Sequence, residues 1–152
     1  MKRILILVAV FTLVATPALA QVSDMVELTR TVLRSEKKAV FAENMWLTDA
    51  EGAVFWPVYN DYEAELTKIN DRVLQLLREY ADTFDTLTDT QAKKIVDETF
   101  DIRKKKLSLR KSYAKKFAKV IPQKKVFRFF QLEYAIEALV NFSIAADLPY
   151  ME

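Results

Sequence analysis

The sequence has no cysteine and no histidine, and only one of its 152 residues is a glycine. Without cysteine it cannot form disulfides, and without either residue type it cannot build the usual zinc sites or catalytic centres that use a histidine base or a cysteine nucleophile. A glycine-rich phosphate loop is also missing, and a sheet with many tight turns is disfavoured because such turns use glycine. We therefore expect an all-α protein that is not an enzyme and holds no cofactor or metal.

The first twenty residues follow the pattern of a secretory signal peptide. Two basic residues open the chain, an apolar run covers residues 4–14, and Ala18 and Ala20 supply small side chains before a cleavage point. The run is too short for an ordinary membrane span, so an uncleaved anchor is the weaker alternative. We predict cleavage after Ala20, a periplasmic location, and a mature single domain of residues 21–152 without a stable membrane anchor.

Hydrophobic spacing predicts how the mature domain is divided into helices. From Phe55 onward, apolar residues are alternately four and three positions apart, which is the heptad seam of a long helix that packs along a partner. The next segment keeps the phase with polar breaks at Thr99 and Lys106, and Pro57 predicts a kink. A short connection near residues 84–87 favours antiparallel neighbours. The predicted helices cover about residues 23–44, 49–83, 89–120 and 123–146.

The last predicted helix, residues 123–146, carries apolar side chains on nearly every face. Such a helix is either buried in the core or paired with another molecule, and the sequence leaves both interpretations open. A thin helical hairpin has little interior of its own, which favours a homodimer. The predicted fold is thus a long antiparallel helical hairpin with flanking N- and C-terminal helices, assembled as a dimer.

Charge is distributed unevenly along the mature chain. Residues 21–101 have a net charge of −8, residues 102–128 carry twelve basic and no acidic side chains, and residues 129–152 have a net charge of −4. The basic stretch either pairs with the acidic segments or offers a basic, partly aromatic surface to an anionic or unfolded partner. Nucleic acid is disfavoured because an exported protein rarely meets it. The candidate client-binding residues are Arg103, Lys104, Lys105, Lys106, Arg110, Lys111, Tyr113, Lys115, Lys116 and Phe117.

Three carboxylates, Asp82, Asp85 and Asp89, cluster around the predicted connection between the long helices. A hard cation prefers such ligands, but their spacing is not that of an EF-hand. Acidic residues at helix starts explain them more simply, because the N-terminal end of a helix is partly positive. We predict no metal there.

Two similar motifs open the long helices. The first is Leu47-Thr48-Asp49-Ala50-Glu51, and the second, forty residues later, is Leu87-Thr88-Asp89-Thr90-Gln91. In each, the threonine can accept a hydrogen bond from the backbone three residues on, while the Glu51 or Gln91 side chain reaches back, as in a capping box. The physical content of the motif is therefore a helix start.

The two motifs resemble the LTXXQ signature of the Spy/CpxP family, with Glu51 replacing glutamine in the first copy. The aromatic stretch from Phe55 to Tyr59 and the aromatic last helix set the chain apart as a separate branch. The resemblance implies a bent helical hairpin that forms a cradle-shaped dimer. It also implies an ATP-independent periplasmic chaperone or envelope-stress modulator that binds unfolded or partner proteins. The alternative is a structural or regulatory adaptor for one specific envelope protein.

Overall fold

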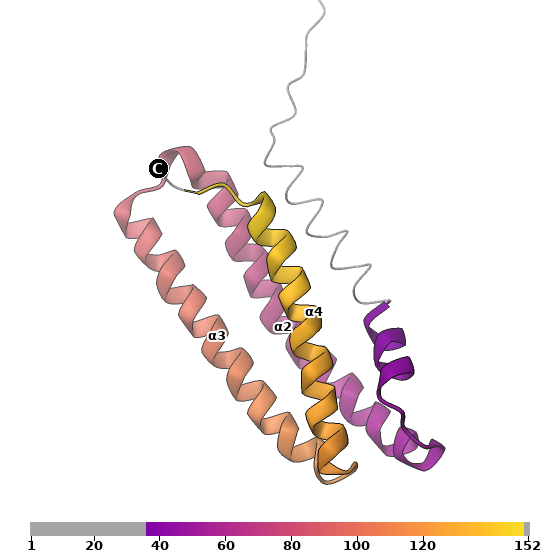
Figure 1. The fold of residues 1–152 in the computed structure, drawn as a ribbon. Coiled ribbons are helices and arrows are strands. Elements are labelled where there is room, and N and C mark those ends of the chain that lie inside the picture. Colours follow the sequence, from indigo (N-terminus) through magenta and orange to yellow (C-terminus); the bar gives the residue numbers. More distant parts are fainter. Residues whose placement is uncertain (1–35, 151–152) are drawn as a thin grey trace, which may run out of the picture.

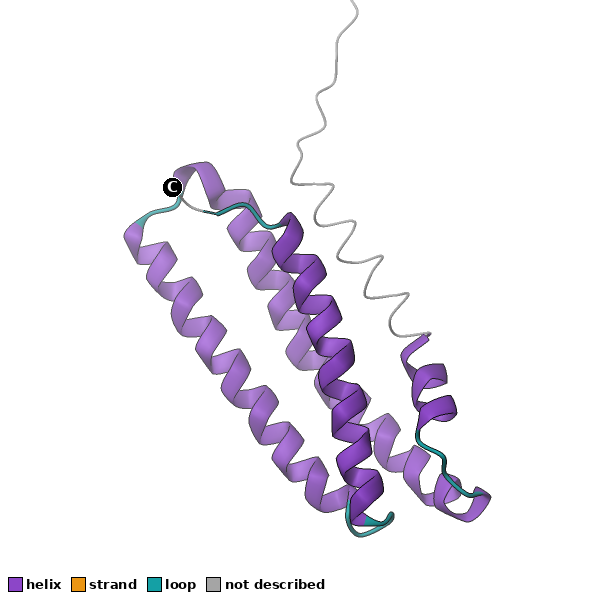
Figure 2. Ribbon diagram, in the orientation of Figure 1, coloured by secondary structure: helices purple, strands orange, loops and turns teal. Residues whose placement is uncertain are grey.

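The structure, a computed structural model, describes residues 36–150. Within this range the chain forms helices and turns and no strand (Figures 1 and 2). The all-α prediction is therefore confirmed for these residues. The predicted signal peptide and the predicted helical residues 23–35 lie outside the described range. Residues 36–44 are helical, followed by α2 (Asp49–Thr83), the 3-10 helix η1 (Phe84–Thr86), α3 (Asp89–Phe117) and α4 (Gln123–Asp147).

The helix ends lie close to the predicted positions. The helix α2 covers the predicted range and continues through Pro57. The helix α3 ends at Phe117, three residues before the prediction, because residues 118–120 turn ahead of Pro122. Pro122 then caps α4, as expected of a residue that cannot continue the preceding helix.

The helices α2 and α3 run in opposite directions. Near their connection, Lys94 Nζ lies 2.6 Å from Glu79 Oε1, and at the far end the rings of Phe55 and Phe117 stack with centroids 5.3 Å apart. The polar break at Lys106 also has a structural reason, because its ammonium lies 3.0 Å from Glu137 Oε1 of α4. The positive charge of Lys106 on the α3 seam is thereby paired with a carboxylate of α4.

The helix α4 returns along the other two (Figure 1). Its C-terminal end reaches the connection between α2 and α3, where the Tyr80 hydroxyl donates to the Pro149 carbonyl oxygen at 2.9 Å. The helical residues 36–44 lie beside the first half of α2, with the rings of Phe41 and Tyr59 5.3 Å apart. Side chains from four helical segments therefore meet at one end of the molecule.

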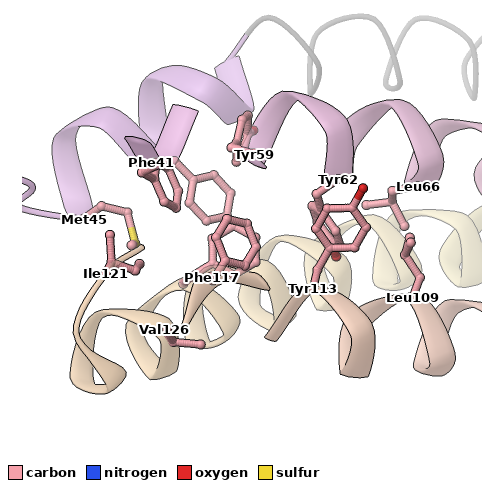
Figure 3. Close-up of a cluster of buried hydrophobic side chains, with 12 residues drawn as sticks. Phe41, Met45, Tyr59, Tyr62, Leu66, Leu109, Tyr113, Phe117, Ile121 and Val126 are labelled. Atoms are coloured by element: carbon pink, nitrogen blue, oxygen red, sulfur yellow. The ribbon is translucent and has the colours of Figure 1, made fainter. Parts of the chain in front are cut away.

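The hydrophobic core occupies this same end and is built mainly from aromatic rings (Figure 3). Phe129 of α4 is fully buried, and its ring lies 4.4 Å from Phe117, 4.9 Å from Phe41 and 5.5 Å from Tyr62 between centroids. Tilted and edge-on contacts of this kind add to the free energy gained from burial alone. The buried cluster consists of Phe41, Met45, Phe55, Tyr59, Tyr62, Leu66, Leu109, Tyr113, Phe117, Ile121, Val126 and Phe129.

Candidate functional site

Both predicted capping boxes are present. Glu51 N–H donates to Thr48 Oγ1 at 3.3 Å, and Thr48 N–H donates back to Glu51 Oε2 at 2.8 Å. In the second box the Gln91 N–H to Thr88 Oγ1 distance is 3.3 Å, and the Thr88 N–H to Gln91 Oε1 distance is 2.9 Å. Leu47 and Leu87, which precede the threonines, are half-buried. The motif residues thus begin α2 and α3 and position the residues that follow.

Replacing Thr88 by alanine is expected to lower the free energy of unfolding by about 1 kcal/mol, because the N-terminal amides of α3 lose their side-chain acceptor. Thr90→Ala is the matched control: Thr90 is exposed inside the same first turn, and alanine is the better helix former there. Urea denaturation of both variants measures the difference. Equal stability of the two variants would contradict a capping role for Thr88.

The basic stretch divides into exposed and immobilised side chains. Four of its twelve cations are only partly exposed, and each is held by another helix or loop. Arg110 Nη2 lies 2.8 Å from Glu137 Oε2, and Lys125 pairs with Glu51 at the start of α2. The eight exposed cations are Arg103, Lys104, Lys105, Lys111, Lys115, Lys116, Lys119 and Lys124. The four partly exposed cations are therefore held within the protein, whereas the other eight lie at its surface, where Lys105 pairs with Asp101 of the same helix at 2.9 Å.

Two of the paired cations fix the turn that leads into α2. Trp46 has a φ of 49°, in the left-handed region that non-glycine residues rarely adopt. Lys125 Nζ donates to the Trp46 carbonyl oxygen at 2.8 Å, and the Arg128 guanidinium lies 3.5 Å from the centre of the Trp46 ring. Arg128 also donates to the carbonyl oxygen of Asn44. These cations stabilise a strained turn, so they are not available to a partner.

The structure corrects the placement of two candidate client-binding residues. Tyr113 and Phe117 are buried in the core, where the Tyr113 ring meets Tyr62 edge-on with centroids 5.3 Å apart and its hydroxyl donates to Glu65 Oε1 at 2.7 Å. Burial raises the pKa of the Tyr113 hydroxyl. Tyr113 belongs to the heptad seam that the sequence indicated, and Phe117 lies beside the seam position Lys116. A seam position faces the partner helix. Neither side chain can contact a client in the folded protein.

Exposed apolar side chains lie instead on α4 and on the outer side of α3. Phe127, Tyr134, Leu139 and Phe142 of α4 each expose about half of their surface or more, although the helix buries Val126 and Phe129. Phe100 and Leu107 of α3 are similarly exposed. The sequence has apolar residues on several sides of α4. It therefore does not show which of the α4 residues face solvent and which face the core.

A buried charge cluster joins three helical segments. Glu133 is only 3% exposed, and its carboxylate lies 2.8 Å from Lys37 Nζ and 3.0 Å from the Tyr62 hydroxyl, which donates to it. Lys37 also contacts Glu63 at 2.7 Å. Burial raises the pKa of the Tyr62 hydroxyl, and the Glu133 charge acts in the same direction. No pattern in the sequence pointed to this cluster, because Lys37 and Glu133 are far apart along the chain.

Neighbouring Glu137 shows how the cluster is balanced. Burial acts to raise the pKa of this carboxyl, but Lys106 and Arg110 outweigh it and hold the pKa below its usual value. A carboxylate with a lowered pKa stabilises the fold at neutral pH, and this contribution is lost as the pH falls through the lowered value. The cluster is thus a structural feature at neutral pH.

Within residues 36–150, no group of three or more acidic side chains is arranged to hold a metal ion, and this includes Asp82, Asp85 and Asp89. None of the helices in the described range is both long and apolar enough to span a bilayer. A search of family models, curated proteins and solved structures gave no match to this chain.

Proposed function

We propose that the protein is an exported, ATP-independent chaperone or envelope-stress modulator that binds unfolded or partner proteins in the periplasm as a homodimer. The observation that carries the proposal is the combination of eight exposed cations in residues 103–124 with exposed apolar side chains on the same two helices, α3 and α4. Charge attracts a partner over a long range, and apolar side chains hold it at short range.

The resemblance of the two capping motifs to the LTXXQ signature supports the same proposal. Both boxes begin helices that lie side by side, as a family member with a helical hairpin requires. The exposed aromatic residues of α4 provide area for a dimer contact as well as for clients. Single apolar side chains are common on protein surfaces. Four large exposed ones on the same helix, as on α4, are typical of an interaction surface.

The test is an aggregation assay with the mature chain, residues 21–152. A model client diluted from denaturant is expected to scatter less light when the protein is added near one-to-one ratio without ATP. A variant with Lys111, Lys115 and Lys119 changed to glutamine should protect less, because these exposed cations no longer attract clients. Glutamine keeps helix propensity, and circular dichroism checks folding.

Unchanged scattering with the native protein would remove the chaperone proposal. In that case, capture of a single saturable envelope partner would support the adaptor alternative. Analytical ultracentrifugation of the mature chain tests the dimer independently, since a monomer at micromolar concentration would contradict the proposed assembly.

A further inference from the structure

The exposed side of α4 carries no charge over most of its length. Between Lys124 and Asp147, which are exposed near its two ends, every exposed residue is apolar, aromatic, an amide or a serine. The charged residues in between are at most partly exposed and are bonded to other parts of the protein: Lys125, Arg128, Glu133 and Glu137. The exposed sides of α2 and α3, by contrast, include lysines and acidic residues along their length. An exposed helix side with aromatic residues and no charge is typical of a surface that another protein covers.

Six exposed residues of this side form a continuous row along α4. They are alternately four and three positions apart, which is the spacing of a helix that packs along a second helix. From its first to its last residue the row is about 27 Å long. In order, the members of this row, called here the α4 row, are Phe127, Gln131, Tyr134, Ala138, Asn141 and Ala145.

The α4 row is complementary to itself when a second copy of the helix runs in the opposite direction. One antiparallel register places each aromatic ring against an alanine and each amide against an amide. The residues that face one another are then Tyr134 and Ala138, Phe127 and Ala145, and Gln131 and Asn141. Large side chains opposite small ones pack closely, and two amides can exchange hydrogen bonds. Two-fold symmetry repeats every contact, as an interface between identical chains requires.

The charges at the two ends of α4 favour the antiparallel direction. Lys124 near the first end and Asp147 at the last are both exposed. In the antiparallel register each lies close to the opposite charge on the second copy, whereas a parallel pair would bring like charges together. Of the 23 basic side chains, Lys2 and Arg3 belong to the predicted signal peptide, so the mature chain has 21 basic and 21 acidic side chains. Two copies therefore meet without net repulsion.

We propose that two copies of the protein associate through the α4 row, as an antiparallel pair with its two-fold axis near Ile136. Phe127, Tyr134 and the flanking Phe142 are 65%, 51% and 74% exposed, which gives roughly 300–450 Å² of aromatic surface in each copy. Both copies bring about 600–900 Å² of ring surface, and with the alanines this reaches the roughly 1,000 Å² of a stable interface. This inference rests on the homodimer of the proposed function and names its interface.

The neighbouring segments of the same chain reach α4 from other sides. Lys37 contacts Glu133, which precedes Tyr134 by one position and therefore points about 100° away from it around the helix. From α3, Arg110 reaches the Tyr134 ring at 5.0 Å from its centre and pairs with Glu137. The outer side of the row is thus open to a second copy. An uncharged row offers no attraction to an anionic lipid surface, which binds cations beside apolar residues.

Sedimentation velocity of the mature chain over a range of concentrations tests the interface. Ala138→Lys is expected to raise the dimer dissociation constant at least about tenfold, because a long charged side chain replaces the methyl group that faces Tyr134. Ala64→Lys makes the same change at an exposed position of α2 and should leave the dimer unchanged. Circular dichroism checks that both variants are folded. A dimer that persists in Ala138→Lys, or an equal loss in both variants, would overturn the proposal.

Single cysteine substitutions test the antiparallel register, since the chain has no cysteine of its own. Ala135 is exposed and lies one residue from the two-fold axis, so Ala135→Cys should be crosslinked to its own copy by a short thiol-specific reagent. In this register Ala145→Cys is about 27 Å from its own copy and should not be crosslinked. Crosslinking of both variants would indicate a parallel pair and overturn the register. A dimer in which neither is crosslinked would overturn the interface.

These outcomes separate the inference from the proposed function. A native dimer that is unaffected by Ala138→Lys keeps the homodimer and removes its α4 interface, whereas a monomeric native chain removes both. Client protection in the aggregation assay is measured independently, and the pairing of α4 leaves Phe100 and Leu107 of α3 exposed for clients. Below the dissociation constant the α4 row is exposed, so substitutions in it change association and leave the stability of a single copy nearly unchanged.

Discussion

Replacing Phe129 by alanine is expected to lower the free energy of unfolding by about 3–5 kcal/mol, the usual cost of removing a buried aromatic ring. Phe129 is fully buried, and rings from the first helical segment, α2 and α3 surround it. Without the ring, α4 would lose its main attachment to the other helices, and urea denaturation at neutral pH measures the loss.

The control for this prediction is two residues away on the same helix. Phe127 is 65% exposed, so Phe127→Ala removes the same ring with little change in burial. We expect a change of less than about 1 kcal/mol, as for surface substitutions in general. Similar losses for Phe127→Ala and Phe129→Ala would show that α4 is rotated about its axis relative to this structure.

Within residues 36–150 the sequence predicted the α-helices well, because their ends have local causes. Thr48 and Thr88 begin helices through bonds to residues three positions away, and Pro122 separates α3 from α4. Signals of this kind depend only on neighbours in the chain. Among the described helix ends, the largest difference from the prediction is at Phe117, and it follows from a turn in residues 118–120 that still has helical spacing of apolar residues.

The orientation of α4 could not be predicted from periodicity. Phe127, Phe129 and Phe130 are equally apolar, and a helix with apolar residues on every side has no preferred face. Its orientation is set by contacts with distant residues, including the pairing of Glu133 with Lys37. The candidate site was partly misassigned for a related reason, because Tyr113 occupies a seam position within a run of surface lysines.

Glu133→Gln is expected to destabilise the protein by about 2–3 kcal/mol, although the substitution changes the size of the side chain very little. Loss of one partner from a buried ion pair commonly costs about 3–5 kcal/mol, because the other charge stays buried without compensation. Here Glu63 still neutralises Lys37, so the expected loss of stability is somewhat smaller than that range. Tyr62 keeps an acceptor in the glutamine carbonyl oxygen.

A double-mutant cycle with Lys37→Met separates this pair from general damage to the core. If the two charges stabilise each other, the double variant will be less destabilised than the sum of the single variants, by about 1–3 kcal/mol. Met replaces the apolar stem of Lys37 and leaves no buried ammonium. Additive losses would contradict direct coupling between Lys37 and Glu133.

The single variant Glu133→Gln also tests what holds the first helical segment, residues 36–44, in place. Lys37 is its charged attachment, and Phe41 and Met45 are its apolar ones. In Glu133→Gln, amide hydrogen exchange in residues 37–45 should therefore accelerate more than exchange in α3, because this segment loses a direct partner. Equal acceleration throughout the chain would instead indicate global unfolding. Since Glu133 belongs to α4, a selective effect would show that the aromatic helix positions the segment through one buried carboxylate.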